Sequence, residues 1–270
     1  GLLWGLELLA WDTTYLPRVV SILVKLNRID PGGSLSNRPL NSLLEIFTTW
    51  KPQTLASPEL RQRLIQKLIK QDKDLGWSFL TALLTKDVGF ESHMPRWRIK
   101  EEILDSGLED GVLQSEVQKG FSFCFRELIS LVGDDSERWI KLLNMTNRMH
   151  PENVETLIHT FENLPEFSGN RKAFLEQLRG VISDHRSYNK TNWALPETYI
   201  KRIEAVFHRL ELTDIVDGKS WLFTDLPKLL TGGDIVSEEY KQECRKQQQA
   251  VISEVWKTKD LNALERLALN

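Results

Sequence analysis

The stretch Ser57-Pro58-Glu59-Leu60-Arg61-Gln62-Arg63-Leu64-Ile65-Gln66-Lys67-Leu68-Ile69-Lys70 decides the fold class of this chain. Its first residues are a typical helix start, because a serine side chain can accept a hydrogen bond from a free backbone N–H and proline fits the first helical position. Apolar residues then recur at steps of three and four, at Leu60, Leu64, Ile65, Leu68 and Ile69. Basic residues occupy the opposite side. The pattern predicts an amphipathic surface helix.

The same kind of pattern repeats on both sides of this stretch. Asp74 is the expected N-cap of the next helix, which reaches Leu84. Residues 213–234 are irregular, but their apolar side chains predict that they pack against the body of the protein. No convincing pair of strands is visible. Further helices are expected at residues 2–11, 15–27, 39–50, 111–132, 136–144, 151–161, 170–184, 196–210, 236–255 and 261–269.

We therefore expect an all-α fold of antiparallel helix pairs, stacked as a HEAT- or TPR-like α-solenoid. Residues 2–31, 39–84 and 151–184 each have the length of one helix pair. No pair reproduces another residue by residue, so an irregular helical domain is the alternative. We interpret residues 1–270 as a single helical-repeat domain, or one subdivided near residues 86–100. Because the terminal helix patterns have no caps, we interpret the chain as a fragment of a longer protein.

The composition excludes several classes of protein. Hydrophobic residues make up 41% and charged residues 27% of the chain, as in ordinary globular proteins. A formal net charge of −3 gives no general attraction to nucleic acid or to anionic membranes. Cys124 and Cys244 are far apart within apolar helix patterns, so reduced core thiols are expected. The apolar residues 2–11 are too few to span a bilayer. We expect no membrane association and a cytoplasmic location.

Nine tryptophans in 270 residues provide candidates for a binding surface. Trp50 ends a helix pattern, and Arg96, Trp97 and Arg98 follow one another in a long loop. These four are the candidate binding residues, because tryptophan and arginine are enriched at protein interfaces. The alternative is that each tryptophan fills the end of a layer of helices. The expected partner is a protein, or the rest of a longer chain.

The sequence contains only weak signals for nucleic-acid binding, phosphate binding or metal binding. Residues 51–73 contain six basic and two acidic side chains, including the run from Arg61 to Lys73, and this excess could follow a phosphate backbone. A solvated helix face explains the same residues, so nucleic acid is not the expected partner. Asp217-Gly218-Lys219-Ser220 resembles the end of a phosphate-binding loop, but residue 213 is threonine where that motif has glycine. No histidine has the spacing of a zinc helix. We expect no metal, no cofactor and no catalytic residue.

One spacing supports a competing hypothesis. Arg179-Gly180-Val181-Ile182-Ser183-Asp184-His185 places arginine and histidine six residues apart near a helix end. The spacing resembles the Arg-x(4–6)-His motif of HEPN ribonucleases, which implies RNA cleavage by acid/base chemistry with Arg179 and His185 as the pair. HEPN motifs have a polar residue after the arginine, and here that residue is Gly180.

Five short phrases carry a broader resemblance: Asp30 to Leu40, Trp50 to Thr54, Asp184 to Tyr188, Trp193 to Pro196, and Trp221 to Phe223. Together they resemble the helical C-terminal regions of very large bacterial proteins, such as those appended to STAND-type NTPases and other antiviral-defence effectors. The resemblance implies that any catalytic machinery lies outside this segment, which would recognise a trigger or scaffold an assembly. We therefore expect a non-catalytic protein-interaction, sensor or scaffold segment.

Overall fold

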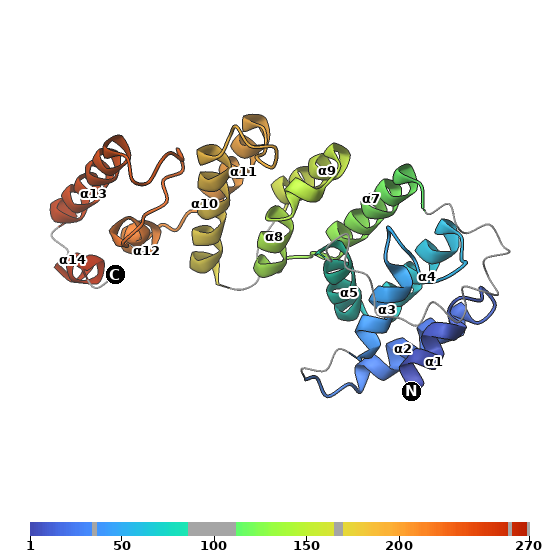
Figure 1. Cartoon of the computed structure of the whole chain (residues 1–270). Helices are drawn as coiled ribbons and strands as arrows, with labels where there is room; N and C mark the ends of the chain where they lie inside the picture. Colours follow the sequence, from blue (N-terminus) through green and yellow to red (C-terminus); the bar gives the residue numbers. More distant parts are fainter. Residues whose placement is uncertain (34–36, 86–111, 165–169, 259–260, 269–270) are drawn as a thin grey trace. The chain divides into compact units, whose positions relative to one another are not determined.

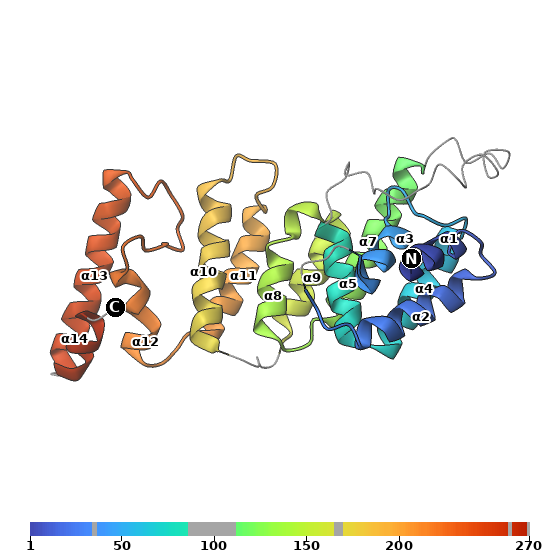
Figure 2. The same ribbon diagram turned by 60° about the horizontal axis from the view of Figure 1, so that its bottom comes forward.

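The computed structural model describes residues 1–33, 37–85, 112–164, 170–258 and 261–268, and its regular elements are all helical (Figures 1 and 2). No strand occurs in these ranges, so the prediction of an all-α chain is confirmed. The α-helices are α1 (Leu2–Leu9), α2 (Leu16–Arg28), α3 (Pro39–Phe47), α4 (Pro58–Gln71), α5 (Lys73–Thr85), α7 (Gln114–Leu131), α8 (Ser136–Leu143), α9 (Pro151–Glu162), α10 (Arg171–Ser187), α11 (Glu197–Leu210), α12 (Ile215–Lys219), α13 (Glu238–Thr258) and α14 (Leu261–Ala268), with 3₁₀ turns η3 (Thr146–Arg148) and η4 (Ser220–Phe223).

The chain forms two compact units, Gly1–Leu131 and Val132–Asn270. Residues 86–100, where the sequence offered a subdivision, lie outside the described residues. In the first unit α2 packs against α3 and α4, α3 packs against α5, and α5 packs against α4 and α7. The rings of Phe47 and Phe79 meet edge to face in its core, with centroids 5.8 Å apart. Helix α2 thus contacts both the next helix in the chain and the one after it, as helices packed in pairs do.

The helix caps of the first unit show one confirmed and one wrong prediction. The Ser57 hydroxyl accepts a hydrogen bond from the Leu60 N–H at 3.3 Å, as expected of an N-cap. Asp74, however, is not the cap of α5. This helix begins at Lys73, so Asp72 occupies the cap position and its carboxylate accepts from the Leu75 N–H at 3.0 Å. Asp72 also accepts a hydrogen bond from Arg28 at 3.3 Å, which ties α2 to the α4–α5 junction.

The second unit contains stacked helix pairs. Helix α8 packs against α10, and α9 packs against α11. Helices α10 and α11 lie side by side and antiparallel (Figures 1 and 2), since Arg171 at the start of α10 donates to the Leu210 carbonyl at the end of α11 at 2.7 Å. Trp139 is fully buried, and its ring centroid lies 5.0 Å from that of Phe161. Aromatic side chains thus pack between α8 and α9.

Residues 213–234 pack against their neighbours, as their apolar content predicted. Val216, Leu222 and Leu229 are buried in a cluster with residues of α13 and α14. The Tyr240 hydroxyl donates to the Pro227 carbonyl and accepts from the Leu229 N–H, both at 2.8 Å. A single buried phenol therefore fixes the course of the chain that leads into α13.

Both cysteines are free and buried, as predicted. Burial raises the pKa of the Cys124 thiol to about 12, and burial also raises the pKa of Cys244. A thiol with a raised pKa carries little thiolate and reacts slowly. Both residues serve as core side chains. None of the helices in the described ranges combines the length and the apolarity needed to cross a bilayer.

Candidate functional site

Of the four residues predicted to bind a partner, the structure describes one, Trp50. Arg96, Trp97 and Arg98 lie outside the described residues. Trp50 is half-buried in the segment that follows α3. This segment is held by backbone hydrogen bonds, from the Gln53 N–H to the Ile46 carbonyl at 3.0 Å among others.

The basic helix α4 has two kinds of cation. Arg61 is a structural residue, because it donates to the Glu116 carboxylate at 2.7 Å and to the Ala56 carbonyl at 3.3 Å. Arg63, Lys67 and Lys70 are exposed along one side. The basic face is thus smaller than the sequence count indicates. The string Asp217–Ser220 is not a loop: Asp214 caps the short helix α12, and Gly218 lies within it.

Arg179 is a buried cation of α10. Its exposed fraction is 5%, and its guanidinium carbon lies 3.8 Å from the centroid of the Trp221 ring. The buried Nε atom has no hydrogen-bond partner among the described residues. Burial lowers the pKa of Arg179 to about 10, and the charges of Glu176 and Glu211 partly oppose this effect. The side chain is held by stacking on an aromatic ring.

His185 lies six residues, or about 1.7 turns, further along the same helix. Its exposed fraction is 6%, and its Nδ1 accepts a hydrogen bond from the Leu195 N–H at 3.1 Å. The imidazole packs against Trp193, with centroids 5.3 Å apart. Burial lowers the pKa of His185, and the charge of Asp184 opposes the shift. The ring is therefore neutral at pH 7, with Nδ1 as acceptor and the proton on Nε2.

The structure gives Arg179 and His185 separate surroundings. A separation of six residues corresponds to about 9 Å along a helix and about 120° around it. Arg179 faces Trp221, whereas His185 faces Trp193 and Leu195. A general base would need a free lone pair, yet the only unprotonated nitrogen of the neutral His185 ring accepts the Leu195 bond. The geometry does not assemble an acid/base pair from these two residues.

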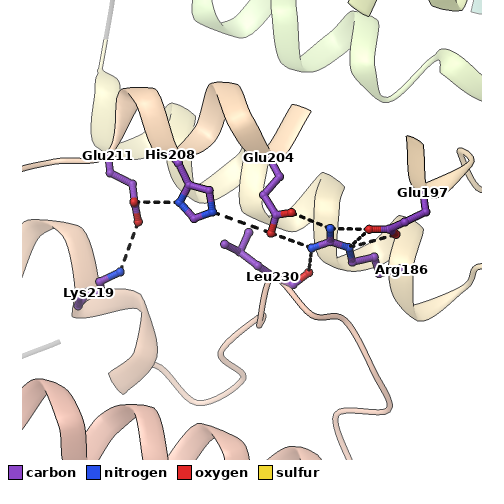
Figure 3. Close-up of polar contacts among 7 residues, drawn as sticks. All are labelled: Arg186, Glu197, Glu204, His208, Glu211, Lys219 and Leu230. Carbon is purple, nitrogen blue, oxygen red and sulfur yellow. Dashed lines mark hydrogen bonds and ion pairs between the residues drawn. The ribbon is translucent and has the colours of Figure 1, made fainter. Parts of the chain in front are cut away.

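The strongest polar cluster surrounds a residue that the sequence analysis did not single out, Arg186 (Figure 3). Its guanidinium donates to the carboxylates of Glu197 and Glu204, at distances down to 2.7 Å, and to the Leu230 carbonyl at 2.7 Å. The arginine side chain is only 14% exposed. These bonds raise the pKa of Arg186 and lower that of Glu204. One side chain thus joins α10, α11 and the 224–237 segment.

The cluster continues along α11 (Figure 3). His208 lies 4.0 Å from Glu204 and 3.0 Å from Glu211, and Glu211 lies 3.3 Å from the ammonium group of Lys219 in α12. Burial acts to raise the pKa of Glu211, but His208 and Lys219 outweigh it, so the pKa is lowered. The pair of Glu211 and Lys219 connects the end of α11 to α12.

The 224–237 segment has further contacts with the end of α10. Lys228 pairs with Asp184 at 2.7 Å, and Ser187 both donates to the Gly233 carbonyl and accepts from its N–H. Gly232 has a φ of +66°, and a Cβ there would lie 2.6 Å from Arg186 Cβ and 2.8 Å from the Ser187 nitrogen. Only glycine fits at this position. At Gly232 the 224–237 segment therefore makes a close contact with the backbone at the end of α10.

A second arginine clamp joins α9 to α11. Arg202 donates to both Glu155, at 2.9 Å, and Glu162, at 2.7 Å. Arg209 donates to the carbonyls of Glu162 and Leu164 at 2.7 and 3.1 Å. These pairs link residues forty or more positions apart. Their role is structural, because every guanidinium group has its partners within the chain.

Helix α1 presents a different kind of surface. It buries Leu6 and Glu7 and exposes a face made of Leu2 (70%), Trp4 (54%), Gly5, Leu8 (39%) and Leu9 (48%). We call this set the α1 apolar face. A Cβ atom on Gly5 would meet nothing within 4 Å. The face has no charged side chain, because the one acidic residue of α1, Glu7, points into the unit.

Comparisons do not assign the chain to a family: no protein-family model matches it, and neither a curated protein nor a solved structure is significantly similar. The described ranges also contain no group of three or more His, Cys, Asp or Glu side chains that could hold a metal ion. The candidate sites therefore rest on geometry alone.

Proposed function

We propose that this chain is a non-catalytic protein-interaction segment, a sensor or scaffold within a larger bacterial protein of the defence type. The observation that carries the proposal is the α1 apolar face. Large apolar side chains that lie together in water are uncommon on soluble proteins except at binding surfaces. Four such side chains and one glycine share this face.

The partner that fits this surface is an amphipathic helix of another protein. Trp4 and Leu8 are four residues apart, and Leu2 and Leu9 are seven apart, so the side chains form ridges along one side of α1. Gly5 lies between them with open space above it, which lets a second helix approach closely. The absence of charge on the face matches an apolar helix surface. Tryptophan supplies the kind of large anchor that dominates protein interfaces.

A ribonuclease is the competing function, and the geometry supports it less well. Arg179 and His185 face different neighbours, and both are nearly fully buried. RNA would have to reach both side chains at one point. Replacement of His185 by alanine would abolish any cleavage that depends on it, which makes the two functions separable.

Site-specific photo-cross-linking tests the proposal. A photoreactive amino acid is placed at position 4 of the full chain in cells that make the protein, and at exposed Lys67 in a matched control. We expect one protein to cross-link at position 4 and not at position 67. That protein, once purified, should bind the unmodified chain.

The variant Leu8→Glu then tests the surface itself. Burial of a leucine side chain contributes about 1.5–3 kcal/mol, so the variant should bind the purified partner at least about tenfold more weakly. Because Leu8 is partly exposed, helicity should not change. Equal cross-linking at positions 4 and 67 would contradict the proposal, and so would a cross-link to a second copy of this chain.

A further inference from the structure

A cavity of about 130 Å³ opens beside the end of α10. It is lined by Asn144 at the end of α8, Asn147 in η3, Asp184 and His185 in α10, and Trp193 in the loop before α11, among others. All of these residues belong to the second compact unit. Neither the Arg186 cluster nor the α1 apolar face includes the cavity.

The polar groups that line this cavity include both hydrogen-bond donors and hydrogen-bond acceptors. Nδ1 of His185 is occupied by the Leu195 N–H, so the Nε2–H is the donor left for the cavity. Asn144 and Asn147 are exposed, and each side-chain amide can both donate and accept hydrogen bonds. Both carboxylate oxygens of Asp184 bind Lys228, at 2.7 and 2.8 Å, and retain lone pairs for further bonds. Donors and acceptors therefore converge on one small space.

An aromatic surface adjoins these groups. Trp193 is 37% exposed, and its ring contacts those of His185 and Tyr188 in tilted arrangements, with centroids 5.3 and 5.6 Å away. Tyr188 is 56% exposed. Lys190, between the two aromatic residues in sequence, is exposed as well. A planar ring can stack on such a surface while its edge reaches polar groups, which is how proteins bind unpaired bases.

The volume limits the size of the ring. A buried apolar cavity of about 150 Å³ holds one benzene molecule, so 130 Å³ admits a single six-membered ring. A pyrimidine fits this space with its hydrogen-bonding edge inward. The second ring of a purine would lie outside the cavity.

We propose that this cavity binds a pyrimidine base, with Trp193 as the stacking residue, Asn144, Asn147 and His185 as hydrogen-bond partners of the base edge, and Lys190 beside its phosphate. The base belongs to a free nucleotide or to a single-stranded RNA. The proposal is independent of the α1 apolar face and of any cleavage by Arg179.

NMR titration of the full chain, labelled with ¹⁵N at the tryptophan indoles, tests this site. The Trp193 signal is identified by its loss in Trp193→Phe. We expect UMP to shift this signal in a saturable way, and AMP to bind at least about tenfold more weakly because of its size. Stronger binding of hexauridylate than of UMP would identify RNA as the source of the base, and equal binding would identify the free nucleotide.

Variants separate stacking from charge. Trp193→Leu should weaken UMP binding at least about tenfold, since the base loses the aromatic ring on which it stacks. Trp256→Leu is the matched control, because Trp256 is 68% exposed on α13 and should leave binding unchanged. Because Lys190 is proposed to lie beside the phosphate, the chain should bind UMP more tightly than uridine. Lys190→Glu should remove this preference. No shift of the Trp193 signal at about 10 mM UMP, far above any useful affinity, would overturn the proposal, and so would equal saturation by N-acetylasparagine amide.

Discussion

Arg186→Met tests whether one largely buried guanidinium group holds the second unit together. Methionine keeps the apolar stem and removes every hydrogen bond of the head group. The bonds to Glu204, whose side chain is 23% exposed, are charge-assisted and contribute about 1.5–3 kcal/mol. The pair with half-exposed Glu197 adds at most about 1 kcal/mol, and the Leu230 carbonyl adds about 1 kcal/mol. Since these contributions are not additive, we expect a loss of about 2–4 kcal/mol.

The control for this variant is Arg245→Met. Arg245 lies 3.8 Å from Glu238, and both side chains are more than half exposed. An exposed pair of this kind contributes less than about 0.5 kcal/mol. The assay is urea unfolding followed by circular dichroism. Because two compact units need not unfold together, hydrogen exchange of residues 226–233 provides the local measurement.

The effect of Arg186 also depends on pH in a defined direction. Arg186 lowers the pKa of Glu204 in the folded protein. A carboxyl group with a lowered folded pKa stabilises the protein above its unfolded pKa of about 4.5, and this stability is lost as the pH falls through the folded pKa. The difference between wild type and Arg186→Met should therefore be constant near pH 7 and shrink below about pH 4.5. Equal stability of the two arginine variants, or a difference that persists in acid, would refute the reasoning.

Three further predictions concern α10 and its contacts. Arg179→Met should leave the free energy of unfolding within about 1 kcal/mol of wild type or raise it, because the change removes a buried charge whose Nε has no hydrogen-bond partner among the described residues; urea unfolding measures this, and a loss above about 2 kcal/mol would contradict it. Gly232→Ala should cost at least about 2 kcal/mol and speed hydrogen exchange near Arg186, whereas Gly133→Ala, with φ +61° but open space, should cost about 1 kcal/mol; equal costs would refute the close contact. His185→Ala and wild type should give the same rate of RNA cleavage in a fluorescent assay, and a lower rate in the variant would restore the ribonuclease hypothesis.

Features of the fold that depend on local sequence could be predicted. The periodicity of Leu64, Ile65 and Leu68 defines α4, and Ser57 caps it as expected. The Asp74 error arose because Asp72 and Asp74 are both good caps, and only the start of the helix distinguishes them. Local sequence patterns thus predict which helices form, but they locate the ends of a helix only to within one or two residues.

The polar clusters could not be predicted, because they join distant residues. Arg186 binds partners 11, 18 and 44 positions away, and the sequence around it is that of an ordinary helix end. Its one sequence signal was the glycine pair at 232–233, which accommodates a close approach. The cavity beside His185 was equally hidden, since Asn144 and Asn147 come from a different helix pair. Single-sequence periodicity contains no information about such pairings.

The central claim is that the α1 apolar face binds a helix of another protein. The affinity of the Gly5→Leu variant for that partner tests this claim most directly. Leucine is a better helix former than glycine by about 0.8 kcal/mol, and nothing lies within 4 Å of the added Cβ. The variant should therefore fold at least as stably as wild type, as measured by thermal unfolding. We predict that it nevertheless binds the partner cross-linked at position 4 at least about tenfold more weakly, because the new side chain prevents close approach of the partner helix. Unchanged affinity in a stably folded Gly5→Leu protein would contradict the account.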